Sequence, residues 1–480
     1  MPEKARPGAA GGGTRTDWAI AGRRSRSFIT SPTPAPALGL RPYQIECIEA
    51  LRRAYAAGRR APILMMPTGG GKTIVFAEVA RSARAKGRRV VVLVHRRELL
   101  RQAAVKLTWA SVPHGIIAAG FPTSPEEPVQ VASVQTLARH REALTDVDLF
   151  VIDEGHHARA DLWQQVLDSQ PNARLLGVTA TPARLDGKGL GVEAGGVFDA
   201  LVTGPSMREL IAAGYLAPTR CFVPSRRLDL TGVKSRAGDY VVSDLVARVD
   251  RPEIAGDAIQ RYRLHADHHP AIAYCCDAHH AERTAETFRR AGYRAACVHG
   301  RLSAPDRDRF IAGLGASEVE VLTSCDLISE GLDVPSVGTV ILLRPTKSLT
   351  LYLQQVGRGT RPAPGKQALI VLDHAGNVVS HGLPDQERKW SLSGIEKAKK
   401  HSLTVLANGE VVRRQREIAE VDDQLQELSD DRLDAVARMS YWQAVHAGLS
   451  KAQLRHYARV HGYNPRWVSH ILRRQRAFAP

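Results

Sequence analysis

A glycine-rich octapeptide at residues 66–73, MPTGGGKT, has the residue types best suited to binding phosphate. Glycines let several backbone N–H groups point into one turn, and the positive end of a following helix adds to them. Lys72 would contact the β- and γ-phosphates of a nucleoside triphosphate, and Thr73 would offer its hydroxyl to Mg²⁺. Met66 stands where the full pattern has glycine, which weakens the match without removing the phosphate-binding residues. The expected cradle is Pro67, Thr68, Gly69, Gly70, Gly71, Lys72 and Thr73.

A second group of reactive side chains, VIDEGHH at 151–157, begins with apolar residues typical of a buried strand. An acid at the carboxyl end of a parallel strand faces the crevice in which ligands bind. We therefore expect Asp153 to hold Mg²⁺ through water and Glu154 to orient and deprotonate the attacking water. Such a pair can also simply cap the next helix, but the phosphate loop upstream favours the functional interpretation. His156 and His157 seldom converge on one metal ion as neighbours, so His156 is expected to couple this site to a second lobe.

The segment QQVGRGTR at 354–361 carries the third set of candidate residues. Arg358 and Arg361 lie three positions apart, which places them on one side of a helix. If a second lobe closes on the first, one or both can reach the γ-phosphate as arginine fingers. Gln354 opens the segment and is expected to take part in coupling. A solvated helix face is the alternative, and the Gly-Arg-Gly setting argues against it.

Short apolar segments that alternate with amphipathic helical stretches must position these residues. This alternation predicts a parallel sheet with crossover helices, and it occurs twice along the chain. The first series of expected strands is 63–66, 90–94, 129–132, 149–152 and 175–178, and the second is 271–275, 295–298, 319–322, 337–343 and 368–372. The predicted fold class is therefore α/β, with two parallel-sheet lobes in tandem and a small C-terminal helical module.

Shifts in composition predict the domain boundaries. We expect a disordered basic tail at 1–37, a nucleotide-binding lobe at 38–205 and a connector at 206–252. A second lobe at 253–388 and a basic, mostly helical module at 389–480 follow. In this interpretation residues 219–252 are polar and poor in strands, and the strand pattern stops after Pro384.

The net charge of +17 is concentrated at the two ends of the chain. Residues 1–37 contribute +4 and residues 435–480 contribute +8, with no acidic residue in the second segment. Basic ends on a nearly balanced body indicate a polyanionic partner, although a genome that favours arginine would also explain the first tail. With no signal-peptide core, no membrane-length apolar segment and six cysteines without a CxxC, we expect a soluble intracellular protein.

Two further groups of residues have both a functional and a structural interpretation. Cys275, Cys276, His279 and His280 could share a metal, but cysteines at the end of a buried strand are more often small apolar fillers. The tail at 435–480 mixes aromatic and basic residues, which could stack on bases and neutralise phosphates or could form a small helical core. We favour a helical module whose aromatic residues are mostly core. Its expected core aromatics are Tyr441, Trp442, Tyr457, Tyr463 and Trp467, and its expected nucleic-acid contacts are Arg473, Arg474 and Arg476.

Nine segments occur in the order found in superfamily 2 helicases, a resemblance that covers roughly residues 38–385. They are RPYQ, PTGGGKT, VLVHRRELLRQ, ASVQTL, VIDEGHH, GVTATP, HGRLS, TSCDLISEGLDVP and QQVGRGTRP. DEGH resembles the DEAH-like and restriction-helicase branches more than the DEAD-box enzymes. TATPARLDGKGLG, GPSMRELIAAGYL and ARVHGYNPRW are similar to RadD-type bacterial repair helicases and their phage relatives. Those proteins often carry a cysteine-rich zinc module after the second lobe, and no cysteine follows Cys325 here.

The resemblance implies two RecA-like lobes and further site residues. Gln44 matches the glutamine that reads the adenine edge, and Asp333 matches a residue near the ribose. Thr179 and Thr181 match the motif that links hydrolysis to strand movement. The residues that match backbone contacts to nucleic acid are Arg96, Ser133, Gln135, His299 and Thr323. Helix capping is nearly as good an explanation for Ser133 and Thr323.

These observations together lead us to expect an ATP-dependent DNA helicase or translocase that uses ATP and Mg²⁺, with a role in DNA repair. The expected partners are single-stranded, forked or branched DNA, with RNA as a possible substitute, and a single-stranded-DNA-binding or repair protein. The expected location is the bacterial cytoplasm, at the nucleoid. The alternatives are an RNA helicase, the motor subunit of a restriction system, and a clamp that does not hydrolyse ATP. Glu154, Arg358 and Arg361 argue against the clamp.

Overall fold

The computed structural model describes most of the two predicted lobes. The described residues are 39–144, 146–155, 161–184, 187–223, 228–236, 238–325, 334–394, 403–406, 408–413, 439, 449, 451–461, 463, 468 and 471–472. Within these residues no helix combines the length and the apolar character needed to cross a membrane. The predicted tail at 1–37 and the predicted roles of His156, Asp333, Arg473, Arg474 and Arg476 lie outside the described residues.

The first lobe is built on a seven-stranded sheet in the order β3-β4-β2-β5-β6-β1-β7, and every neighbouring pair is parallel. The strands are β1 (Pro62–Met65), β2 (Val90–Val94), β3 (Gly115–Ile117), β4 (Val129–Ser133), β5 (Leu149–Asp153), β6 (Arg174–Thr179) and β7 (Ala200–Thr203). The five predicted strands are confirmed. The two strands that the sequence did not predict, β3 and β7, are short and lie at the two edges of the sheet.

Helices cover both faces of this sheet because successive strand residues alternate between two cores. In β2, Val90, Val92 and Val94 join the core beneath α1, α2 and α3, whereas Val91 and Leu93 join the core beneath α4 and α5. A strand buried on both faces needs the continuous apolar sequence seen here. The helices are α1 (Pro42–Ala56), α2 (Lys72–Arg84), α3 (Arg97–Trp109), α4 (Val134–Arg139) and α5 (Asp161–Asp168).

The second lobe has an eight-stranded sheet in the order β12-β13-β11-β14-β15-β8-β17-β16. Its strands are β8 (Thr219–Phe222), β11 (Ala271–Tyr274), β12 (Ala295–Val298), β13 (Val321–Ser324), β14 (Thr339–Leu342), β15 (Leu369–Asp373), β16 (Leu403–Val405) and β17 (Glu410–Arg413). The five predicted strands are parallel, as expected. Its helices are α8 (Pro252–Ala266), α9 (Ala278–Arg290), α10 (Ala304–Gly315), α11 (Leu349–Gly357) and α12 (Asn377–His381).

Two sequence predictions were wrong at the edge of this second sheet. Strand β8 lies within the segment interpreted as a connector, yet it pairs in parallel with β15. Strands β16 and β17 lie after Pro384, where we expected no strands, and β17 pairs antiparallel with β8. Both errors have the same cause, because none of these three strands has a continuous apolar sequence. Strands β8 and β17 mix charged or polar residues with apolar ones, and β16, at the edge of the sheet, is largely exposed.

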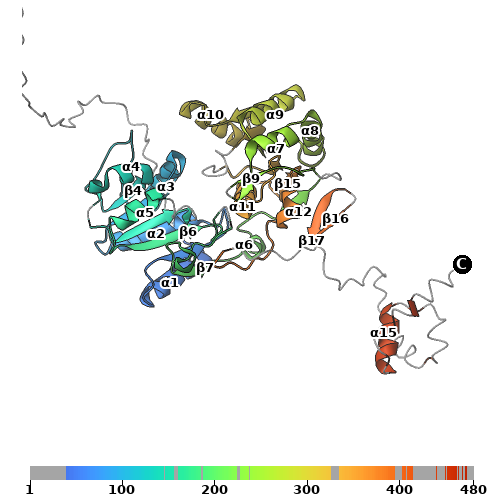
Figure 1. Cartoon of the computed structure of the whole chain (residues 1–480), viewed down its shortest axis with the longest axis horizontal. Coiled ribbons are helices and arrows are strands. Elements are labelled where there is room, and N and C mark those ends of the chain that lie inside the picture. Colours follow the sequence, from blue (N-terminus) through green and yellow to red (C-terminus); the bar gives the residue numbers. More distant parts are fainter. Residues whose placement is uncertain are drawn as a thin grey trace, which may run out of the picture.

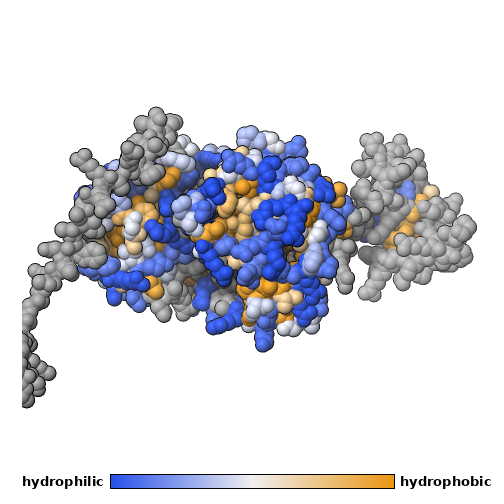
Figure 2. All heavy atoms as spheres, turned by 90° about the horizontal axis from the view of Figure 1, so that it is seen from above, coloured by the Kyte–Doolittle hydropathy of each residue, from blue (hydrophilic) through white to orange (hydrophobic). Residues whose placement is uncertain are grey.

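The connector begins with α6 (Met207–Ala212), whose Ser206 and Glu209 form a capping box. It also contains a short hairpin, β9 (Ser235–Arg236) with β10 (Asp239–Tyr240), and α7 (Val242–Val249). Figure 1 shows the two lobes side by side, with α15 (Lys451–Val460) apart from both. Tyr457 is buried in a small cluster around α15, as expected for a core aromatic residue, whereas Tyr463 is 37% exposed and does not take the expected core position. Figure 2 shows a mostly hydrophilic surface with scattered apolar patches.

Candidate functional site

The predicted phosphate cradle is a turn between β1 and α2 that only glycine can complete. Gly69 and Gly71 have φ angles of 84° and 87°, in the left-handed region that favours glycine. The N–H of Gly70 donates to the carbonyl of Pro67 at 3.0 Å, which closes the turn. Gly71 caps α2 without a side-chain cap, so the first N–H groups of the helix are available to a ligand. The backbone geometry therefore fits a phosphate group.

Neighbouring elements hold this loop in place. The Tyr43 hydroxyl donates to the carbonyl of Gly70 at 2.9 Å, and the N–H of Met66 donates to the carbonyl of Thr179 at 3.0 Å. Sequence reasoning quoted Tyr43 within RPYQ but gave it no role, since its contact is visible only in three dimensions. Met66 is fully buried, so an apolar residue fits where the usual pattern has glycine.

Gln44 lies directly against the cradle, as expected for a residue that reads a nucleobase. A Cβ atom placed on Gly71 would lie 2.5 Å from Gln44 Nε2, so the amide lies against this glycine. Gln44 Oε1 accepts the N–H of Arg41 at 3.0 Å, which orients the amide. A groove of about 700 Å³, lined in part by Ile45 and Ile74, lies next to these residues. Glu78, Arg81 and Arg84 also line this groove and Gln44 does not, so the contact of its amide with Gly71 is what places Gln44 at the cradle.

The two acids follow β5, as predicted. Asp153 is 9% exposed and ends the strand, and Glu154 has a left-handed φ of 54°, which is uncommon outside glycine. The N–H of Glu154 donates to Asp153 Oδ1 at 3.0 Å. Burial raises the pKa of Asp153, and the charge of Glu154 raises it further, while Lys72 acts in the opposite direction. A carboxylate that is costly to ionise here fits a place for a divalent cation.

Lys72 is surrounded by charges from both lobes. Its Nζ donates to the carbonyl of Met66 at 3.2 Å. Burial lowers the pKa of Lys72, Glu154 and Asp153 oppose that shift, and Arg358 and Arg361 lower the pKa further. Because charges influence each other appreciably only at short range in a screened protein, the two arginines lie near the phosphate loop. A polyphosphate would neutralise this group of cations.

The arginine segment reaches the cradle from the second lobe. The prediction that Arg358 and Arg361 share one side of a helix was wrong, because α11 ends at Gly357 and both arginines follow it. A Cβ atom on Gly357, the last residue of α11, would lie 2.4 Å from Thr68 Cβ. A Cβ atom on Gly69 would lie 3.2 Å from Thr360 Oγ1 and 3.7 Å from Arg361 Cγ. The phosphate loop and the arginine segment are therefore in direct contact. Thr73, the predicted Mg²⁺ ligand, is the second residue of α2 and is partly exposed beside this interface.

One residue that holds the arginine segment was missed by sequence reasoning. Lys366 Nζ donates to the carbonyls of Val337 at 2.5 Å, Arg361 at 2.8 Å and Pro335 at 3.4 Å, and also to that of Gly359. Burial, together with the nearby charge of Arg361, lowers the pKa of Lys366 to about 8. A single lysine in a polar loop gives no signal in the sequence, because its carbonyl partners come from two separate segments.

The predicted coupling residues join the two lobes. Thr181 Oγ1 donates to Thr350 Oγ1 of α11 at 3.0 Å, and both side chains are buried. Thr179 Oγ1 donates to the carbonyl of Thr181 at 2.8 Å and accepts the N–H of Thr181 at 3.2 Å. Gln354 is 2% exposed within α11. A hydrogen bond between the segment after β6 and α11, the helix that precedes the arginine segment, gives these threonines a physical route for coupling.

Three of the five predicted nucleic-acid contacts lie together at the carboxyl edge of the first sheet. Ser133 ends β4, and its Oγ donates to Gln135 Oε1 at 2.8 Å. Gln135 Nε2 donates to the carbonyl of His95 at 2.9 Å, next to Arg96. Ser133 makes no side-chain capping hydrogen bond to α4, so the capping alternative is not supported for this residue.

The other two predicted contacts lie in the second lobe, and one of them was wrong. His299 lies after β12, and its Nε2 is 3.0 Å from Glu282 Oε1. Thr323 is fully buried within β13, and its hydroxyl donates to the carbonyl of Ala281 at 2.8 Å. A side chain enclosed in this way cannot contact a nucleic acid, and it does not cap a helix either.

The cysteines and histidines at 275–280 do not form a metal site in the part of the chain that the structure describes. Cys275 and Cys276 are buried, and His280 Nδ1 accepts the N–H of Cys276 at 3.2 Å. Burial raises the pKa of Cys275 and lowers the pKa of His280 to about 4, as expected for packed side chains. Among the described residues, no group of three or more His, Cys, Asp or Glu side chains could hold a metal ion.

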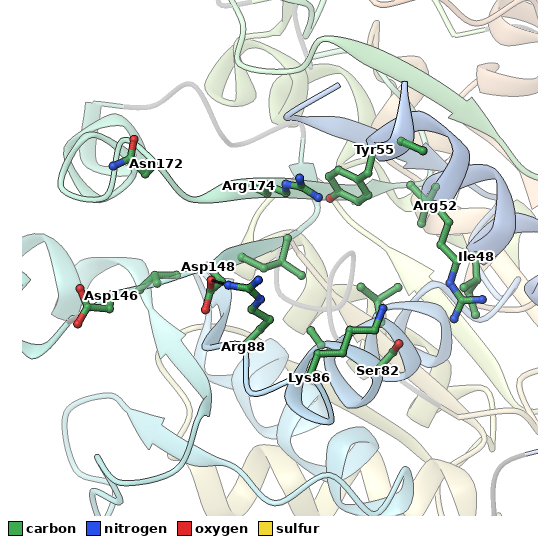
Figure 3. Close-up of a pocket in the computed structure, with 16 residues that line it drawn as sticks. Ile48, Arg52, Tyr55, Ser82, Lys86, Arg88, Asp146, Asp148, Asn172 and Arg174 are labelled. Atoms are coloured by element: carbon green, nitrogen blue, oxygen red, sulfur yellow. Dashed lines mark hydrogen bonds and ion pairs between the residues drawn. The ribbon is translucent and has the colours of Figure 1, made fainter. Parts of the chain in front are cut away.

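A separate cavity of about 760 Å³ lies at the opposite, amino-terminal edge of the first sheet. Figure 3 shows Arg88 beside Asp148 and Arg174 beside the ring of Tyr55. These contacts are an ion pair of 2.9 Å and a cation–π contact of 5.5 Å. Since none of the predicted site residues lines this cavity, it is distinct from the candidate nucleotide site.

Comparisons with known proteins match the two lobes separately. Residues 37–184 match the family model described as the type III restriction enzyme, res subunit, and residues 254–363 match the helicase conserved C-terminal domain. A 51.5 kDa protein of a Lactococcus phage is 33% identical over 329 residues, which are 68% of this chain and 68% of the relative. IRC3 of Saccharomyces cerevisiae, a candidate ATP-dependent helicase, is 28% identical over 411 residues, covering 79% of this chain and 58% of the relative.

A solved structure has the same fold. It is a fragment of a candidate HsdR subunit of a type I restriction enzyme from Vibrio vulnificus, with a TM-score of 0.55 and 24% identity. The match covers 72% of this chain and 65% of that structure. The chain thus spans little more than half the length of the yeast relative and about two thirds of the solved fragment.

Proposed function

This chain belongs to the superfamily 2 helicases of the DEAD/DEAH type, related to restriction-type subunits, and from that premise we propose that it is an ATP-dependent DNA translocase or helicase. The family membership implies an ATP-hydrolysing enzyme. One observation supports a motor most directly, namely the contact between Gly357 of the second lobe and Thr68 of the first. A nucleotide site divided between two lobes can convert binding and hydrolysis into relative movement.

In the proposed reaction, each residue acts according to its position. Lys72 and the backbone N–H groups of the cradle bind the β- and γ-phosphates, and Gln44 orients the base. Glu154 orients a water molecule and accepts its proton during attack on the γ-phosphorus. Arg358 and Arg361 stabilise the negative charge that develops on the transferred group.

Thr73 and Asp153 would hold Mg²⁺, because the hydroxyl at the start of α2 and the carboxylate at the end of β5 are oxygen donors of the kind that this ion prefers. When bound, the ion supplies charge neutralisation at the phosphate oxygens. Loss of the γ-phosphate would weaken the contact between the lobes. Thr181 and Thr350 would pass that change to the segments at the carboxyl edges of the sheets, where Arg96 and Gln135 lie.

The test is the steady-state ATPase rate with single-stranded, duplex, forked and branched DNA and with RNA. We expect DNA to stimulate the wild-type protein and both Lys72→Ala and Glu154→Gln to abolish the activity. Lys72→Ala should weaken nucleotide binding, whereas Glu154→Gln should bind ATP and fail to cleave it. ATPase activity that no polynucleotide stimulates would overturn the proposal.

An RNA helicase is the second candidate, and the same panel separates the two. The match of the first lobe to a restriction-enzyme subunit supports DNA over RNA. A role in DNA repair at the bacterial nucleoid, with a single-stranded-DNA-binding protein as partner, rests on the RadD-like segments and the basic ends. Stimulation by RNA alone would replace the DNA assignment while leaving the ATPase mechanism in place.

A further inference from the structure

A short hairpin in the connector lies beside α11, the helix that leads into the arginine segment. Strand β9 pairs antiparallel with β10, with Ser235 opposite Tyr240 and Arg236 opposite Asp239. Figure 1 shows β9 next to α11, on the side of the second lobe that faces the first. The following helix, α7, anchors the hairpin because Leu245 and Val249 pack against Cys276, which follows β11. The hairpin is therefore fixed to the carboxyl edge of the second sheet.

Asp239 attaches the hairpin to the segment that follows β14. Its carboxylate accepts the N–H of Lys347 at 2.8 Å and the hydroxyl of Thr346 at 2.9 Å. Arg344, only 9% exposed, has a guanidinium nitrogen 3.6 Å from Asp239 Oδ2. Bonds of this kind to a partly buried carboxylate are among the stronger ones in proteins. Movement of the hairpin would therefore move this segment with it.

The same segment forms the start of α11. Thr346 Oγ1 accepts the N–H of Ser348 at 3.0 Å, and Ser348 Oγ caps the helix by accepting the N–H of Leu351 at 3.3 Å. Two residues into the helix, Thr350 contacts Thr181 of the first lobe. The helix ends at Gly357 against the phosphate loop. A continuous set of hydrogen bonds thus links the hairpin to both lobes and to the nucleotide site.

The exposed side of the hairpin is basic. Lys234 and Arg236 are exposed, and Lys347 Nζ donates to Ser235 Oγ at 2.5 Å while lying 4.7 Å from the ring centre of Tyr240. The carboxylate of Asp239 is occupied by its hydrogen bonds to the segment after β14. Asp244, the nearest acid on α7, accepts the backbone N–H of Lys234 at 3.3 Å. Lys234 and Arg236 of the hairpin, together with Lys347 of the adjoining segment, place three cations at the interlobe side, an arrangement that suits a polyanion.

We propose that the β9–β10 hairpin contacts the phosphate backbone of the nucleic acid and transmits that contact, through Asp239 and α11, to the arginine segment. This inference rests on the proposed function and adds to it a strand-sensing element. Lys234 and Arg236 supply the phosphate contacts, and Asp239 acts as a positioning residue. Binding of a strand on the hairpin would hold α11 against the phosphate loop and so favour the closed, hydrolysing arrangement.

The first test is the salt dependence of DNA binding by the full chain carrying Lys234→Glu and Arg236→Glu. Two lost phosphate contacts should reduce the slope of log affinity against log salt by about 2, together with lower affinity. The matched control is Arg59→Glu with Lys86→Glu, which makes the same charge change at exposed positions on the opposite edge of the first lobe. An unchanged slope in the hairpin variant, or an equal loss in the control, would overturn the inference.

The second test separates transmission from binding. Asp239→Asn keeps the size of the side chain and removes its charge, so we expect near-normal DNA affinity with at least a severalfold loss of DNA stimulation of the ATPase. Circular dichroism and thermal unfolding verify that each variant is folded. Full stimulation in folded Asp239→Asn protein would overturn the transmission step. If no polynucleotide stimulates the wild-type ATPase, the proposed function itself fails. If DNA stimulates the wild type and the hairpin variants behave like it, only the inference about the hairpin fails.

Discussion

Replacing Gly357 by alanine tests the closed contact between the two lobes without altering a charged residue. The added methyl carbon would lie 2.4 Å from Thr68 Cβ and 2.8 Å from Thr68 Cγ2. Carbon atoms in ordinary contact approach to about 3.5 Å, so the lobes must separate locally by about 1 Å or the phosphate loop must deform. Arg358 and Arg361 would keep their chemistry and lose their position.

The expected cost follows from packing. Forcing one extra methyl group into a filled contact costs about 1–3 kcal/mol, which corresponds to a fall of about 5- to 150-fold in kcat if closure precedes cleavage. A displacement of about 1 Å in a catalytic group leads to a similar estimate, about 100-fold. Each lobe has its own cores, so the unfolding temperature should stay close to that of the wild type.

The assay is the DNA-stimulated ATPase rate at saturating ATP, compared with nucleotide affinity measured by a fluorescent analogue. Gly256→Ala is the matched control, because Gly256 also lies in a helix of the second lobe and a Cβ atom there would meet nothing within 4 Å. We expect Gly256→Ala to retain the wild-type kcat and to gain about 0.5–1 kcal/mol in stability. A wild-type kcat for Gly357→Ala would refute the view that hydrolysis requires this contact.

Three other predictions concern hydrogen bonds. Lys366→Met leaves several buried carbonyls without their donor, so we expect thermal unfolding to show about 1–3 kcal/mol lower stability. The fall in kcat should be larger than the change in KM. Equal changes in kcat and KM would contradict a positioning role for Lys366. Thr181→Val removes the hydroxyl that donates to Thr350, at a cost of about 1 kcal/mol. This cost predicts about fivefold slower DNA-stimulated ATP hydrolysis, and an unchanged rate would count against coupling through this hydrogen bond. The hydrogen bond to Glu320 raises the pKa of His268, so this pair stabilises the fold fully below the pH at which a free histidine titrates and less as the pH rises through the raised pKa. The unfolding temperature of the wild type should therefore fall slightly across that pH range. His268→Gln should remove this part of the pH dependence.

The central parallel strands of both lobes were predictable because each is buried on two faces and must be continuously apolar. Val90–Val94, which is buried at every position, has the predicted bounds for this reason. Strand β8 and the β16–β17 hairpin were not predictable, since pairing with β15 and with each other defines them more than their own sequence does.

The nucleotide-binding half of the site was predictable for a related reason. Residues 66–73 and Asp153–Glu154 have their chemistry within a few consecutive residues, so local sequence carries the signal. Thr323 was misjudged because a threonine after a strand and a threonine within one look alike in a sequence, and only packing against Ala281 distinguishes them.

By itself, therefore, the sequence identified the residues that we propose to bind phosphate, hold magnesium, activate water and supply arginines. Local backbone geometry and side-chain chemistry suffice for that, because each group is encoded within one turn or one strand end. The tertiary structure decided which of these groups meet. Gly357 contacts Thr68, Thr181 bonds to Thr350, and Lys366 gathers carbonyls from two segments, all across long sequence separations. Contacts of that kind depend on how separately folded lobes pack together, and no local pattern records them.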